Sequence, residues 1–284
     1  MMRYCGRDFS EAELTLIRTL LSDDPGRNRA ALSRLTCSAL NWLKPDGGLK
    51  EMSCRVAMLR MQEDGLIQLP SPRRLRPITN ILIRVETAPQ EPIHLPVHGL
   101  PCLQLRQVGG RADSRLWNEY IHRYHYLGHK ALPGAQLRYW VTAGDRLVAL
   151  LGFSAAAWQC APRDKFIGWT HEQRQKNLHL VVNNARFLIL PWVCSDNLAS
   201  KVLGLAARQL AGDWQLRYGY RPLLLETFVE KDRFTGTCYR AANWHQVGIT
   251  QGRGKLGPAG KQSVPIKDIW LYPLGKDFKY GLTR

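Results

Sequence analysis

The chain has 284 residues, of which 40 are Lys or Arg and 23 are Asp or Glu, so its formal net charge is +17 at pH 7. A hydrophobic content of 45% and a charged content of 22% are those of a folded globular protein, which excludes wholesale disorder. No apolar run approaches the roughly 18 residues of a membrane span, and the first residues contain no signal-peptide stretch. We therefore expect a cytoplasmic protein that has no membrane partner and binds a polyanion, nucleic acid first.

The seven cysteines stand apart from one another, and no CxxC or CxH spacing occurs among them. A structural zinc site normally needs such paired ligands. The spacing therefore predicts buried thiols in a reducing compartment rather than a zinc site.

Residues 1–70 predict a small helical domain of the winged helix-turn-helix type. Ser10 followed by Glu13 has the spacing of a capping box, and the helix that it opens ends at residues 23–26. Apolar residues at helical spacing predict two more helices, between residues 32 and 43 and between 51 and 64, before a short strand at 66–69.

In a winged helix of this kind, the third helix presents cations to DNA. It would direct Arg55 and Arg60 towards a groove, while Arg73, Arg74 and Arg76 would lie near the wing and the phosphates. The alternative is a helical subdomain that only packs on the rest of the chain.

Seven of the sixteen prolines fall within residues 70–101. Because proline lacks the backbone N–H and disfavours helix, this density predicts a linker over residues 71–101, with one strand at 81–85 inside it.

Residues 102–284 predict a second domain in which helices and strands alternate. The expected elements, in order, are a helix at 113–124, a hairpin within 136–154, a strand at 186–193, a long helix at 198–217, a strand at 223–229, a short helix at 238–243 and a strand at 246–249. This pattern predicts a mixed α/β sheet flanked by helices.

Most of the positive charge belongs to this second domain. Residues 77–284 hold 27 basic and 14 acidic residues, whereas residues 1–76 hold 13 and nine. The tail contains the Gly-rich segment 250–255, which is suited to a phosphate backbone, so we expect phosphate contacts from Arg240, Arg253, Lys255 and Lys261. A solvated basic face is the alternative.

The order hairpin, strand, long helix, strand, short helix, strand resembles the core of the GCN5-related N-acetyltransferases (GNATs) over residues 130–250. That resemblance implies a pyrophosphate site for acetyl-CoA at the start of the long helix, in a glycine-rich loop. Here the corresponding segment, Cys194–Ser200, contains no glycine and adds the negative Asp196. Acetyl-CoA is therefore not the expected cofactor.

Longer motifs resemble the DruA family over nearly the whole chain. They include HYLG at 125–128, RFLILPWV at 186–193, LLETFV at 224–229 and GTCYRAANW at 236–244. The resemblance implies a DNA-associated role in Druantia anti-phage defence or, as in relatives beside or fused to transposases, in mobile elements. It also implies partners such as a helicase or other defence subunits.

A carboxylate inside an apolar strand is costly unless it has a partner or a role. Glu226 is in this position, and Asp164 is the expected second carboxylate. Together they are candidates to hold Mg²⁺ for phosphodiester cleavage. The alternative is a structural salt bridge from Glu226 to an arginine such as Arg186 or Arg240.

Tyr239 offers a different route, because a tyrosine beside Arg240 is a candidate nucleophile towards a DNA phosphate. His125, three residues after His122, is a candidate to bind a metal ion that orients this phosphate, although packing is the alternative. In a GNAT-like site the same tyrosine would be the general acid for the leaving thiolate.

Aromatic residues at predicted strand ends and loops, among them Trp158, Trp169, Trp192 and Trp244, suit base stacking, with burial as the alternative. The leading hypothesis is a protein that binds DNA, or RNA, and cleaves or nicks it. The alternatives are an acyltransferase on a nucleic-acid-bound substrate and a non-catalytic subunit that recruits a partner to DNA.

Overall fold

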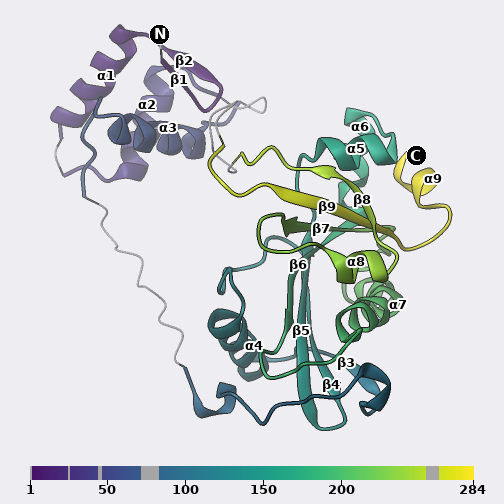
Figure 1. Ribbon diagram of the computed structural model, residues 1–284. Coiled ribbons are helices and arrows are strands. Elements are labelled where there is room, and N and C mark those ends of the chain that lie inside the picture. The colour runs from purple at the N-terminus through teal and green to yellow at the C-terminus, as the bar shows by residue number, and fades with distance from the viewer. Residues whose placement is uncertain (1, 25, 44–46, 72–82, 254–261) are drawn as a thin grey trace. The chain divides into compact units, whose positions relative to one another are not determined.

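The computed structural model describes residues 2–24, 26–43, 47–71, 83–253 and 262–284, and Figure 1 shows its helices and strands. Contacts divide the chain into two units, Met1–Asn80 and Ile81–Arg284, each with its own hydrophobic core. In the part of the chain that the model describes, no helix is long and apolar enough to cross a bilayer.

The described N-terminal unit contains a strand pair followed by three helices. These elements are β1 (Met2–Tyr4), β2 (Arg7–Phe9), α1 (Glu11–Ser22), α2 (Arg29–Ala39) and α3 (Glu51–Glu63). The predicted capping box is confirmed, since the Glu13 backbone N–H donates to Ser10 Oγ at 3.2 Å and the Ser10 N–H donates to Glu13 Oε2 at 2.8 Å. Leu14 and Ile17 of α1 then pack into the core.

The short strand predicted at 66–69 is not formed. Its backbone groups are taken by side chains instead, because Gln62 Oε1 accepts from the Leu69 N–H at 3.0 Å and Arg18 Nε donates to the Leu66 carbonyl at 3.1 Å. The strand pair lies at the chain start, where Cys5 and Gly6 turn it with φ of 50° and 79°. The described unit therefore has the predicted helices, while its strands lie before them.

The second half of the predicted linker packs on the α/β unit. Residues 85–87 and 97–99 form short 3₁₀ turns. Thr87 is buried and donates to Glu119 Oε1 at 2.7 Å, and the Ile93 N–H donates to the Trp192 carbonyl at 2.8 Å. The strand expected at 81–85 is absent from residues 83–85, and residues 81 and 82 lie outside the described part of the chain.

A mixed seven-stranded sheet forms the centre of the described α/β unit, which confirms the predicted fold class. Its order is β3-β4-β5-β6-β7-β9-β8, and every neighbouring pair is antiparallel except β6 and β7, which are parallel. The strands are β3 (Leu103–Gln107), β4 (Leu137–Ala143), β5 (Arg146–Ala155), β6 (Val181–Ile189), β7 (Leu224–Glu230), β8 (His245–Ile249) and β9 (Lys267–Pro273).

Two long helices cover opposite faces of the sheet (Figure 1). The alternation of side chains along β4 shows this directly. Tyr139 donates its hydroxyl to Asp213 of α7 (Leu198–Tyr218) at 2.9 Å, whereas the next residue, Trp140, packs edge-on against Tyr120 of α4 (Arg111–Tyr124). Both helices agree closely with those predicted.

Shorter helices complete the layers. Around β7 and β9, α5 (Ala161–Ile167) and α9 (Phe278–Leu282) contribute to a separate core cluster, and α6 (His171–Asn177) contacts α9. The remaining short helix, α8 (Thr237–Ala241), contacts α7. Asn177 Nδ2 donates to the carbonyls of Leu282 and Arg284, which fastens the chain end to α6.

The strand predicted at 186–193 is displaced in the structure, where β6 begins at Val181 and ends at Ile189. Because Asn183 and Asn184 are polar, a hydrophobicity pattern does not reveal where this strand starts. Beyond it, the Val193 N–H donates to the Leu190 carbonyl at 2.9 Å in a turn. The hairpin and the strands at 223–229 and 246–249 lie where the sequence predicts them.

Candidate functional site

A cleft of about 990 Å³ lies where β6 and β7 part. The two strands pair only between residues 181–183 and 224–226, although both continue beyond that point. The cleft is lined by residues 183–189 of β6 and 227–229 of β7, by residues 124–127 at the end of α4, and by residues 236–239 at the start of α8. The cleft therefore opens because the pairing of β6 with β7 stops after three residue pairs.

The cleft is lined by cations and, among the described residues that line it, by no carboxylate. Its basic residues are His125, Arg186, Arg233, Arg253 and Lys267. Arg186 is partly buried, donates Nη1 to the carbonyl of Ala185 at 2.7 Å, and leaves its buried Nε without a partner. No carboxylate in the described part of the chain pairs with it, and burial lowers its pKa.

His125 lines the cleft directly after α4, in an extended conformation rather than on the helical face that carries His122. Burial, with a smaller effect of Arg186, lowers its pKa to about 4, so the ring is neutral at pH 7. Its Nδ1 accepts the Leu127 N–H at 3.2 Å, which places the ring proton on Nε2. His125 is thus arranged as a hydrogen-bond donor and not as a metal ligand through Nε2.

Tyr239 also lines the cleft, in the middle of α8. Its buried hydroxyl donates to Asn184 Oδ1 at 2.9 Å, and Asn184 Nδ2 donates to the Arg186 carbonyl at 3.1 Å. Burial raises the pKa of the phenol. This environment keeps the proton on Tyr239 and engages it with Asn184, which opposes formation of the phenolate that nucleophilic attack requires.

The two candidate carboxylates lie outside the cleft and meet at one arginine. Glu226 is fully buried and accepts from Arg163 Nη1 at 2.8 Å and from the Ala157 N–H at 2.6 Å. Asp164 Oδ1 accepts from Arg163 Nη2 at 2.9 Å, and its Oδ2 accepts from Arg174 at 3.1 Å. The partner of Glu226 is therefore Arg163, rather than Arg186 or Arg240.

This arrangement does not suit a divalent cation. All four carboxylate oxygens already accept a hydrogen bond, and the Arg163 guanidinium stands between the two acids. Burial raises the pKa of Glu226, against the opposing effect of Arg163. Among the described residues, no cluster of three or more His, Cys, Asp or Glu side chains is placed to hold a metal ion.

The predicted DNA-contacting residues are spread over both units. Arg253 lines the cleft, whereas Arg240 lies over the Trp270 ring at 5.9 Å. In α3, Arg55 contacts Glu51 and Ser33, and Arg60 is partly buried. The remaining predicted contacts, Arg73, Arg74, Arg76, Lys255 and Lys261, lie outside the described residues.

Three cations of the cleft were not among the predicted contacts: Arg186, Arg233 and Lys267. An arginine at the start of the apolar run 186–193 is the one sequence signal that points to a role for Arg186. Of the tryptophans considered for base stacking, Trp169, Trp192 and Trp244 are buried, while Trp158 is 59% exposed.

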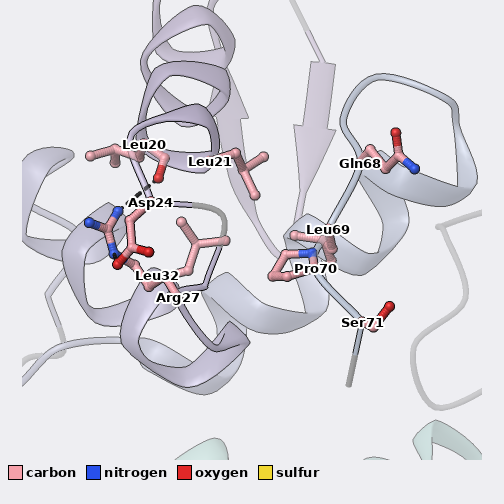
Figure 2. A pocket seen from close by; sticks show the side chains of 9 residues that line it. All are labelled: Leu20, Leu21, Asp24, Arg27, Leu32, Gln68, Leu69, Pro70 and Ser71. Carbon is pink, nitrogen blue, oxygen red and sulfur yellow. Dashed lines mark hydrogen bonds and ion pairs between the residues drawn. The ribbon is translucent and has the colours of Figure 1, made fainter. Parts of the chain in front are cut away.

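A smaller cavity of about 320 Å³ lies within the N-terminal unit (Figure 2). Apolar side chains such as Leu21, Leu32 and Leu69 line it, and Asp24 and Arg27 form an ion pair at 3.6 Å on its wall. Arg27 also donates to the Leu20 carbonyl at 2.8 Å. Both charged groups are therefore already occupied by interactions within the unit.

A family model described as Druantia protein DruA matches residues 62–281. No curated protein is similar to this sequence at a significant level.

Solved structures similar to this chain include N-acetyltransferases. A variant of the spermidine N-acetyltransferase SpeG from Vibrio cholerae is 12% identical over 62% of this chain and 95% of its own, with a TM-score of 0.40. The ribosomal-protein-S18-alanine N-acetyltransferase from Escherichia coli is 10% identical over 62% and 98%, with a TM-score of 0.37. A probable acetyltransferase from Staphylococcus epidermidis is 10% identical over 61% and 99%, with a TM-score of 0.40. Nothing about substrate or cofactor follows from similarity at this level.

Replacing Arg163 tests whether the buried ion pair is structural. We expect Arg163→Met to lower the free energy of unfolding by about 3–5 kcal/mol, because Glu226 is left as an uncompensated buried charge. Urea denaturation followed by tryptophan fluorescence measures this. Arg106→Met is the matched control, since Arg106 is 64% exposed in its pair with Asp113, and we expect it to cost less than about 1 kcal/mol. A loss no larger than that of the control would contradict the structural role.

The lowered pKa of His125 predicts how stability depends on pH. In the unfolded chain this imidazole takes up a proton near its usual pKa of 6.5, whereas in the folded protein it does so only near pH 4. Stability should therefore fall as the pH drops from about 6.5 towards 4. In urea midpoints measured at pH 7, 6 and 5, His125→Gln should make this fall shallower. His94→Gln, at an exposed site outside the cleft, should leave the slope at its wild-type value.

Proposed function

The chain belongs to the DruA family, and on that premise we propose that it binds nucleic acid, DNA first, through the cleft between β6 and β7. Its role would be that of the DNA-binding component of an anti-phage defence or mobile-element system. A helicase or another subunit of such a system is the protein partner that this role implies.

The observation that carries the proposal is the sign of the charge in the cleft. Arg186, Arg233, Arg253 and Lys267 line it without any carboxylate among the described lining residues. A partly buried guanidinium such as Arg186, with an unpartnered Nε, is stabilised by an anion that accepts its hydrogen bonds. A phosphate supplies those acceptors, and the neutral His125 adds an Nε2–H donor.

The division of charge supports the same location. The net positive charge of residues 77–284 exceeds that of residues 1–76. In the N-terminal unit, Arg55 and Arg34 both lie close to Glu51. We therefore assign the main affinity to the α/β unit and an orienting role to the N-terminal unit.

Strand cleavage by a metal held at Asp164 and Glu226 is not part of the proposal. Both carboxylates are engaged by Arg163, and neither lines the cleft. The raised pKa of Tyr239 also opposes its use as a nucleophile. The chemistry of the site favours binding over hydrolysis.

Neutralising Arg186 tests the site. We expect Arg186→Gln to weaken binding of a labelled DNA at least about tenfold, since a hydrogen bond to a charged group contributes about 1.5–3 kcal/mol. The slope of log K against log salt should also become less steep by about 1, because one fewer phosphate is neutralised. Fluorescence anisotropy over a range of salt concentrations measures both quantities.

Arg115→Gln is the control, because it removes the same charge from an exposed position of α4 outside the cleft. We expect it to retain near wild-type affinity. DNA affinity that is independent of salt, or equal losses in both variants, would contradict binding in the cleft.

An acyltransferase is the second candidate, and the observation that favours it is the position of the Tyr239 hydroxyl in a cleft between parallel strands. Against it, α7 begins at Leu198 after Asn197, which has φ of 63°, and no glycine-rich turn precedes it. We expect saturating acetyl-CoA to leave the melting temperature unchanged in differential scanning fluorimetry. A clear increase, lost in Tyr239→Phe or reversed by free CoA, would favour the acyltransferase instead.

A further inference from the structure

Two exposed aromatic side chains lie at the cleft, and neither is buried in a hydrophobic core. Tyr126 is 38% exposed and Phe234 is 45% exposed, and both line the cleft. Their ring centroids lie 5.3 Å apart at an interplanar angle of 63°. One comes from the segment after α4 and the other from the segment between β7 and α8, so the tertiary fold brings them together.

Cationic and donor groups surround this aromatic pair. The Arg233 guanidinium lies 4.9 Å from the centre of the Tyr126 ring, and the His125 ring stacks on the same Tyr126 ring at 4.9 Å and 26°. Glu230 is the nearby acid, and its carboxylate lies 3.8 Å from Arg233. Arg186 remains without a carboxylate in the described part of the chain.

We propose that the cleft takes a single-stranded nucleic acid, with an unpaired base stacked on Tyr126 and Phe234 and an adjoining phosphate on Arg186 and Lys267. This inference rests on the proposed function, because it specifies which form of nucleic acid the same cleft binds. Exposed aromatic rings beside a cationic groove are the arrangement that binds single strands, since each base offers a π face and each linkage a negative charge.

The position of the groups favours an unpaired strand over a duplex. A duplex keeps the faces of its bases in the stack, so rings such as Tyr126 and Phe234 reach them only when a base is unpaired. Proteins that read the bases of a duplex directly insert a helix or a two-stranded ribbon into its major groove. Here Arg186 and Lys267 are partly buried on strands β6 and β9 inside the cleft.

The size of the cleft agrees with this. Its volume of about 990 Å³ is at the upper end of the roughly 300–1,000 Å³ range of small-molecule pockets. It offers room for an unpaired nucleotide with its phosphate, while the rest of the strand lies outside.

Binding of single-stranded and duplex oligonucleotides to the full-length protein tests the proposal. In fluorescence anisotropy, we expect a labelled single strand to bind more tightly than the duplex of the same sequence and length. Tyr126→Ala and Phe234→Ala should each weaken single-strand binding about 5- to 150-fold, which corresponds to the 1–3 kcal/mol of one base–aromatic stack. Tyr126→Phe, which keeps the ring, should retain wild-type affinity.

Tyr280→Ala is the matched control. Tyr280 is 65% exposed and has Arg284 at 5.1 Å over its ring, as Tyr126 has Arg233, yet it lies on α9 outside the cleft. It should bind the single strand as the wild type does. Single strands of DNA and of RNA with the same sequence show which nucleic acid the cleft prefers. If Tyr126→Ala weakens the binding of both strands, stacking is supported, because stacking does not depend on the sugar.

Duplex binding as tight as single-strand binding, or single-strand affinities of Tyr126→Ala and Phe234→Ala within about twofold of wild type, would overturn the inference. If Arg186→Gln still weakens binding at least about tenfold in that case, the proposed function stands without the inference. If the wild type binds neither form, the proposed function itself fails.

Discussion

The parting of β6 and β7 is the constraint on which the candidate site depends. A strand that leaves its neighbour exposes backbone groups that must find other partners. Here side chains supply them, since Thr227 donates its hydroxyl to the Asn184 carbonyl at 3.0 Å and Asn184 donates to the carbonyls of Gly152 and Arg186. The register of β5 and β6 also shifts at this point, which makes Ala185 an extra residue in β6. The open cleft is therefore held by the same residues that line it.

A second constraint is the fully buried guanidinium of Arg163. It donates to Glu226, to Asp164 and to the Ala157 carbonyl, and so links α5 to β7. A buried arginine of this kind is tolerated only when its donors are satisfied. Glu226, which its place in an apolar strand singles out as a catalytic candidate, and Asp164, the expected second carboxylate, are thus used to position a helix. Glu226 lies on the face of β7 opposite to Thr227.

The contrast between Arg163 and Arg186 separates structure from function in this chain. Both are arginines of the α/β unit, and Arg163 is fully buried whereas Arg186 is partly buried. One has acidic partners on two sides, whereas the other has none among the described residues. An arginine kept partly buried without a counterion reduces stability unless a ligand provides the negative charge, which is why the cleft rather than the carboxylate pair is the candidate binding site.

The sequence by itself determined the class of fold, the capped helix after Ser10, the long helix after Asn197 and the excess of positive charge on the second domain, because periodicity, capping and charge are local properties. It also singled out Tyr239 and His125, which the structure places in one cleft. It did not determine the partner of Glu226 or the aromatic pair of Tyr126 and Phe234, because these residues lie 63 and 108 positions apart from their partners. Only the tertiary structure decided that β6 and β7 separate, since strand pairing depends on residues distant in the chain and leaves no periodic signal within either strand.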